Sequence, residues 1–106
     1  MLYTDIELVE GLKNRDAKAL AHIWKLEKTI LVHFAENLVC SKEDAEYIVG
    51  DSFMKLWANH SDFESLTAIK SFLYDTTRES CLNFFKYSRK MSEIQTIFAP
   101  GPDRNN

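Results

Sequence analysis

The side chains best suited to chemistry lie in the last third of the chain, where cations alternate with aromatic residues. If residues 65 to 90 form a helix, half of its surface carries Lys70, Tyr74, Arg78, Phe85, Lys86 and Arg89. Cations neutralise phosphates and release counterions, and aromatic rings stack on unpaired bases. This face therefore suits single-stranded or partly melted nucleic acid. The same pattern also fits a solvated helix whose spare aromatic residues pack on the chain's own tail.

Catalytic motifs are missing from the sequence. It contains no Gly-rich phosphate loop, no His-x-x-x-His, no Cys-x-x-Cys and no Gly-x-Ser-x-Gly. At helical spacing the carboxylates of Asp44, Glu46 and Asp51 do not converge on one point. Cys40 and Cys81 are far apart and in no metal-binding spacing, which is typical of reduced, structural thiols. We therefore expect no enzyme, no cofactor and no metal site.

A second unusual surface is predicted for residues 43 to 58. Wound as a helix, this segment buries one stripe, made of Ala45, Ile48, Val49, Ser52 and Leu56 with Phe53 at its edge. Tyr47 and Met54 fall on the opposite side, and Trp57 falls between the two. A small domain has one core, so large side chains on a second face indicate a protein partner. Alternatively, another helix of the same domain covers them.

The elements that must position these surfaces are four helices, so the predicted fold is all-α, a compact bundle. Thr4 or Asp5 begins a helix to about Leu12, Asp16 begins one over 17 to 39, and Ser41 begins one that ends near Ala58. A polar loop spans 59 to 65, and the fourth helix runs to about Lys90, with a fraying extension over 92 to 98.

Apolar spacing predicts the buried stripes of the two long helices. For the second helix the stripe is Leu20, Ile23, Trp24, Leu26, Ile30, Leu31, Phe34 and Leu38. For the fourth helix it is Ile69, Phe72, Leu73, Thr76, Ser80, Phe84 and Tyr87.

Length and composition set the remaining limits. A chain of 106 residues that is 45% hydrophobic suits one domain, which we place at residues 1 to 92. Residues 93 to 106 would begin an interdomain linker or tail, and its last part, 99 to 106, should be disordered or extended. No apolar run is long enough for a membrane span, and the N-terminus lacks the features of an export signal, so we expect a cytoplasmic protein without membrane insertion. The net charge of −3 disfavours indiscriminate nucleic-acid binding, although residues 86 to 90 hold three cations and no acid.

Two long motifs, taken in order, resemble a known family. The run DAEYIVGDSFMKLW at 44 to 57, a polar loop, and IKSFLYDTTRESCLNFFKYSRK at 69 to 90 are similar to region 2 of bacterial sigma-70 factors, especially the extracytoplasmic-function group. The segment DIELVEGLKNRDAKALAHIW looks like the N-terminal opening of that group. The resemblance covers about residues 4 to 91.

The resemblance implies a transcription initiation module. In the family, the helix matching 43 to 58 docks on the clamp helices of the largest subunit of core RNA polymerase, which implies the polymerase contacts Tyr47, Asp51, Met54, Lys55 and Trp57. The following loop and helix start capture a base of the non-template strand, which implies the contacts Asn59, His60, Phe63 and Lys70. The fourth helix helps to melt the promoter minus-ten element, which implies the DNA contacts Tyr74, Arg78, Lys86, Tyr87, Arg89 and Lys90.

The chain also departs from the family pattern. The family often has Asn at Glu79, Asp at Asn83 and Arg at Lys86, and Tyr87 and Ser88 thin the usual basic string. Lysine lacks the bidentate hydrogen bonding of arginine, which predicts weaker or altered promoter contact. The family's region 4 is not in this chain, so we expect a region 2 piece or a truncated factor. The alternative function is a helical protein-interaction module, a decoy or anti-sigma target, without useful DNA binding; the resemblance also implies an anti-sigma factor as a partner.

Overall fold

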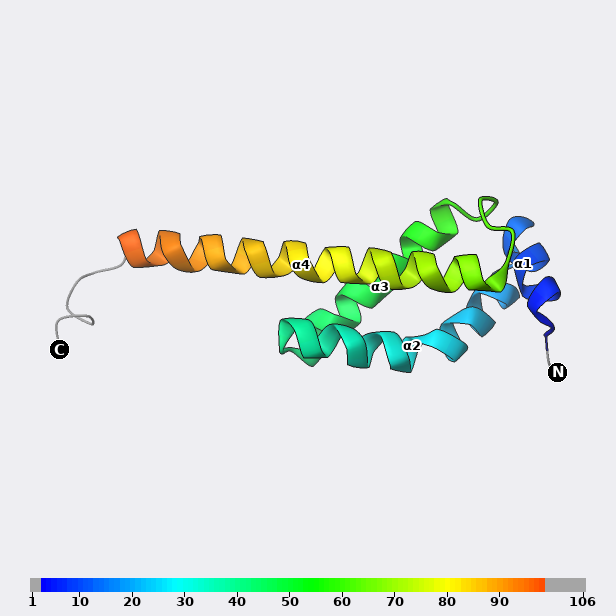
Figure 1. Ribbon diagram of the computed structural model, residues 1–106, viewed down its shortest axis with the longest axis horizontal. Helices are drawn as coiled ribbons and strands as arrows, with labels where there is room; N and C mark the ends of the chain where they lie inside the picture. Colours follow the sequence, from blue (N-terminus) through cyan, green and yellow to red (C-terminus); the bar gives the residue numbers. More distant parts are fainter. Residues whose placement is uncertain (1–2, 99–106) are drawn as a thin grey trace.

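The computed structural model describes residues 3 to 98, and it is all-helical over that range. Four helices follow one another as α1 (Asp5–Lys13), α2 (Ala17–Val39), α3 (Lys42–Ala58) and α4 (Leu66–Phe98), with no strand among residues 3 to 98 (Figure 1). The predicted fold class is thereby confirmed. The predicted tail from residue 99 onward lies outside the described residues.

Local capping explains where the first three helices begin. Thr4 Oγ1 accepts a hydrogen bond from the Glu7 N–H at 3.1 Å, and the Thr4 N–H donates to Glu7 Oε1 at 2.9 Å, which completes a capping box. Asp16 accepts from the Lys18 N–H at 2.9 Å, and Ser41 accepts from the Asp44 N–H at 3.3 Å. Each cap satisfies a backbone N–H that the helix leaves without a partner.

The body of the protein is formed by α1, α2, α3 and the first half of α4 around one core. Helix α2 contacts the other three helices, and α3 also packs along α4. A pair of buried hydroxyls links α3 to α4: the Thr77 hydroxyl donates to Ser52 Oγ at 3.0 Å, and the Ser52 hydroxyl donates to the Ile48 carbonyl at 3.1 Å. This link holds together the two helices whose outer surfaces were predicted to bind partners.

The buried face of α2 differs from the predicted stripe. Leu26, Ile30 and Leu38 are 46%, 54% and 39% exposed, so their predicted burial is wrong. The fully buried row instead includes two small residues, Ala19 and Ala35. Ala19 is buried where α1 crosses α2 closely at Gly11, and such a crossing requires small side chains. A search for large apolar residues overlooks these positions.

The buried face of α4 runs from Ile69 and Leu73, as predicted, to Thr77 and Cys81, whereas the predicted Thr76 and Ser80 are half-buried. Beyond Phe84 every side chain of α4 over 85 to 97 is exposed, because the helix leaves the body there (Figure 1). Tyr87, predicted to be part of the core stripe, is therefore 64% exposed. We call residues 85 to 98 the overhang. It is continuous helix across the predicted end near Lys90 and the predicted domain boundary at residue 92.

None of the helices within residues 3 to 98 combines the length and the apolar character that crossing a bilayer requires.

Candidate functional site

The outer face of α3, as predicted, points away from the core. Tyr47 is 78% exposed and Met54 is 67% exposed, so no other helix of the domain covers them. Asp51 and Lys55 flank these side chains and pair with each other, with Lys55 Nζ 3.3 Å from Asp51 Oδ2. The intervening Gly50 has nothing within 4 Å of the place where a Cβ would be. We use "outer face of α3" for Tyr47, Gly50, Asp51, Met54 and Lys55.

Gly50 is informative because no packing contact within the chain explains why a glycine occupies this position. A glycine in the interior of a helix destabilises it by about 1 kcal/mol relative to alanine. Close packing would explain the absence of a side chain, but no atom of the described chain approaches this position. The backbone at Gly50 is left bare between two large exposed side chains, which suits close approach by another molecule.

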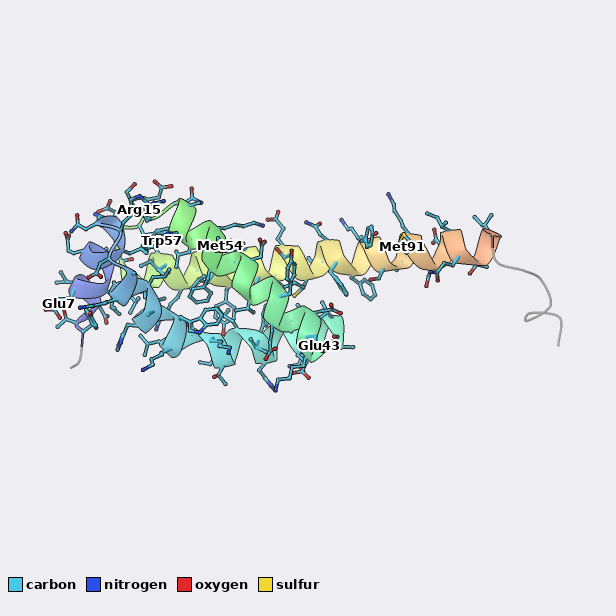
Figure 2. All side chains as sticks on the ribbon, turned by 180° about the vertical axis from the view of Figure 1, so that it is seen from behind. Glu7, Arg15, Glu43, Met54, Trp57 and Met91 are labelled. Carbon is cyan, nitrogen blue, oxygen red and sulfur yellow. The ribbon has the colours of Figure 1, made fainter. Side chains whose placement is uncertain are left out.

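Trp57 lies between the buried and outer faces of α3, as its spacing predicted, and the polymerase contact that the resemblance implied for it stays a prediction. Its half-buried ring lies under the guanidinium of Arg15, whose Cζ is 5.2 Å from the ring centroid. On another side the His60 ring lies 6.4 Å away, centroid to centroid. Figure 2 shows Arg15 and Trp57 together at the end of α3 that is remote from Glu43. Trp57 is therefore part of a cluster with the α1–α2 turn and the 59–65 loop.

The predicted contact residues in the loop over 59 to 65 differ in their burial. Asn59 is exposed and ends α3, with its side-chain amide donating to the Lys55 carbonyl at 2.9 Å. His60 is half-buried, and its Nδ1 lies 3.0 Å from the Lys13 carbonyl oxygen. Phe63 is only 7% exposed and packs edge-on against Phe72, with centroids 5.1 Å apart. Contrary to the predicted base contact, the Phe63 side chain anchors the loop to the core.

Two predicted DNA contacts at the start of α4 also have neighbours inside the chain, although the Lys70 side chain is about half exposed. The ammonium of Lys70 lies 3.8 Å from Glu27 Oε2, and Glu27 is 6% exposed. Tyr74 is half-buried and packs edge-on against Phe34, with centroids 5.3 Å apart. Lys70 therefore compensates a buried carboxylate, and Tyr74 joins α4 to α2. Neither side chain is as free for a partner as the sequence pattern indicated.

Further along α4 the predicted cations are exposed. Arg78, Lys86, Arg89 and Lys90 take part in none of the ion pairs found among residues 3 to 98. Arg78 and Arg89 share one face with Leu82 and Phe85, because the spacing i, i+4, i+7, i+11 is helical. Leu82 is 43% exposed and Phe85 is 53% exposed. We call Arg78, Leu82, Phe85 and Arg89 the α4 stripe; Leu82 was missed, although the spacing could have found it.

A groove separates α3 from α4 where α4 leaves the body, and it has a volume of about 450 Å³. Tyr47 and Ile48 line it from α3, while Phe84 and Tyr87 line it from α4. Tyr87 lines this groove together with Tyr47, and it also lines a surface pocket with Lys86, Arg89 and Lys90, which were predicted with it as DNA contacts. The groove connects the outer face of α3 to the overhang.

The described part of the chain offers little for metal or thiol chemistry. Residues 3 to 98 include no group of three His, Cys, Asp or Glu side chains that could hold a metal ion. Cys40 is exposed, whereas Cys81 is buried, and that burial raises the pKa of the Cys81 thiol. A raised pKa lowers the fraction of reactive thiolate, so Cys81 is suited to packing.

Comparison of the chain with models of known protein families, with curated proteins and with solved structures finds no match.

Proposed function

We propose that this chain is a transcription initiation module that docks on core RNA polymerase through α3 and binds the non-template strand of a promoter through α4 and the 59–65 loop. The proposal starts from the sequence resemblance to region 2 of sigma-70 factors. The observation that carries it is the outer face of α3, where Tyr47 and Met54 are exposed on either side of a bare Gly50. Exposed apolar side chains of this size suit the buried centre of a protein interface.

The α4 stripe supports the nucleic-acid half of the proposal. It combines two guanidinium groups with an exposed aromatic ring, the pairing that tracks phosphates and stacks on unpaired bases. Lys86 and Lys90 add two further exposed cations on the same helix. The two surfaces lie on different helices, so polymerase and DNA can be bound at once.

The docking half is tested by calorimetry with isolated clamp helices of the largest polymerase subunit. Met54→Glu places a charge in an apolar interface, which should weaken binding about tenfold or more. Ile6→Glu is the matched control, because Ile6 is 75% exposed on α1 and lies off the proposed surface. Unchanged affinity of the Met54→Glu variant, or equal losses in both variants, would contradict docking through α3.

The nucleic-acid half is tested by neutralising Arg78, Lys86, Arg89 and Lys90 to glutamine in a polymerase-dependent transcription assay. Promoter-dependent transcription should be lost, and binding of a single strand should become less salt-dependent by about 0.7 in slope for each lost phosphate contact. Lys18, Lys25 and Lys42 are exposed cations on α2 and α3 that serve as a control set. Transcription that survives the α4 changes would refute the assignment.

The groove between α3 and α4 favours a second candidate, a helical protein-interaction module without useful DNA binding. Tyr47, Ile48, Phe84 and Tyr87 give it an apolar lining that suits a partner's side chains. An anti-sigma factor is the partner that the resemblance implies. This candidate predicts normal clamp binding by the Arg78, Lys86, Arg89 and Lys90 variant and no promoter-dependent transcription even by the unmodified chain.

A further inference from the structure

The overhang carries a row of large apolar side chains that the body of the protein leaves exposed. Tyr87, Met91 and Ile94 are 64%, 37% and 46% exposed, and Met91 lies well beyond the other helices in Figure 2. With the half-buried Phe84, they are spaced alternately three and four positions apart, as in the apolar seam of a coiled coil. We call these four residues the overhang seam. Helical spacing places the seam on the same side of α4 as the buried Thr77, so it extends the packing surface of that helix beyond the body.

The groove between α3 and α4 opens where the overhang seam begins. Its apolar lining is made of Tyr47 and Ile48 from α3 and Phe84 and Tyr87 from α4. Two carboxylates, Asp44 and Asp51, line it as well. Asp51 is paired with Lys55 at 3.3 Å, whereas none of the ion pairs found over 3 to 98 includes Asp44. An occupant that fits this groove should therefore present apolar side chains together with a cation.

The overhang itself is a segment of that chemistry. Its charged residues over 85 to 98 are the cations Lys86, Arg89 and Lys90 and the single acid Glu93. None of these cations belongs to an ion pair within the described part of the chain. Lys90 precedes Ile94 by one helical turn, so a cation lies next to the overhang seam. An overhang is held away from its own groove by the rigid course of α4, but a second copy can supply one.

We propose that the chain forms a two-fold symmetric dimer in which the overhang of each copy covers the groove of the other. The two overhangs pack antiparallel through their seams, with Ile94 of one copy against Phe84 of the other and Met91 against Tyr87. In a two-fold interface each of these contacts occurs twice, so both seams and both grooves are covered at once. The surface is thus complementary to itself.

Charge favours the antiparallel direction. Ser52 of α3 meets Thr77 of α4, whereas Asp44 lines the groove with Tyr87, so α3 runs antiparallel to α4 and Asp44 lies at the overhang end of the groove. When Ile94 of the second copy reaches the groove, its Lys90 lies one turn, about 5 Å, further out and comes to Asp44. Parallel overhangs would instead place each cation against its own copy, and such like-charge contacts are unfavourable.

The size of the surface sets the expected strength of the dimer. An overhang of about 14 residues is roughly 20 Å long. Two of them, with the mouths of the grooves, form an interface near or below the lower limit of about 1,200 Å² for stable complexes. We therefore expect a dissociation constant in the micromolar range, so that monomer and dimer exchange with concentration.

Sedimentation equilibrium of the whole chain, from about 1 µM to about 1 mM, tests for the dimer. Ile94→Glu places a charge in each seam and should raise the dissociation constant at least tenfold. Thr96→Glu is the matched control: it adds the same charge to the overhang, but two positions along a helix lie on nearly opposite sides, so the dimer should persist. A chain that is monomeric throughout, or equal effects of the two variants, would overturn the inference.

Exchanging the charges tests the antiparallel pairing itself. Lys90→Glu and Asp44→Lys should each weaken dimer formation, because each variant sets like charges against one another in both symmetric contacts. An equimolar mixture of the two variants should form a heterodimer of about the original affinity, since every contact then joins opposite charges. Circular dichroism confirms that each variant is folded. Two folded variants whose mixture dimerises no better than either alone would refute the proposed pairing.

Dimer formation is independent of the proposed function. A strictly monomeric chain would leave the clamp-binding and transcription tests unaffected, and the groove would then be open to a partner of different sequence. Conversely, failure of the Met54→Glu and promoter tests would not alter the sedimentation result.

Discussion

Replacing Gly50 with alanine should stabilise the chain and, at the same time, weaken its contact with a partner of α3. Gly50 lies in the middle of α3, and a Cβ there would have nothing within 4 Å. No clash opposes the change, so the whole helix-propensity gain of about 1 kcal/mol should be realised. For a domain of this size that gain corresponds to a rise in Tm of roughly 4–8 °C.

Gly11 provides a matched control, because it is a helical glycine in the opposite environment. A Cβ at Gly11 would fall 2.6 Å from the Cβ of Ala19, where α1 crosses α2. Gly11→Ala should therefore lower the free energy of unfolding by about 1–3 kcal/mol through overpacking. Urea unfolding followed by far-ultraviolet circular dichroism measures both variants, with equal slopes required for the comparison.

The binding measurement completes the argument for Gly50. If its bare backbone serves close approach by a partner, the stabilised Gly50→Ala variant should bind the polymerase clamp helices less tightly than the unmodified chain. A variant that is no more stable than the unmodified chain would refute the stability argument. One that is more stable and binds equally well would refute the functional explanation of the glycine.

The remaining predictions concern the buried polar groups of the core. Thr77→Val should lower the free energy of unfolding by about 1 kcal/mol, and adding Ser52→Ala should recover part of that loss because no unpaired partner is left behind; a urea double-mutant cycle measures the coupling. The buried Cys81 should react with a thiol reagent only as the chain unfolds, whereas the exposed Cys40 should react at once. The folded-state pKa of Cys81 is raised, so its contribution to stability should be intact below the ordinary thiol pKa and be lost as pH rises beyond it; Cys81→Ala should flatten that decline in alkaline urea unfolding.

Helix boundaries were predictable where local chemistry sets them. Thr4, Asp16 and Ser41 each cap a helix with their own side chains, and a cap depends on residues only two or three positions apart. The end of α4 has no such signal at the predicted position near Lys90, and the helix continues to Phe98. The end of α4 could therefore not be predicted from the sequence.

The face that a helix buries depends on contacts with other helices, and these contacts cannot be derived from the spacing of residues within one helix. Ile30 was expected in the core and is 54% exposed, whereas the small residues Ala19 and Ala35 of the same helix are fully buried. The candidate site shows the same limit. Trp57 and Arg15 are 42 positions apart, and only the packing of the α1–α2 turn against the end of α3 brings them to 5.2 Å.

The overhang has a consequence for how α4 forms. A free helix of about 14 residues is marginal in water, because the first turn is costly to nucleate. In this chain the buried half of α4 supplies the nucleus, so the overhang needs only propagation, one hydrogen bond for each added residue. Met91, on the overhang in Figure 2, is about two turns past the last half-buried side chain, Phe84. The body thus acts as a template that extends helical order roughly 20 Å into solvent, over a stretch whose side chains from 85 to 97 are all exposed.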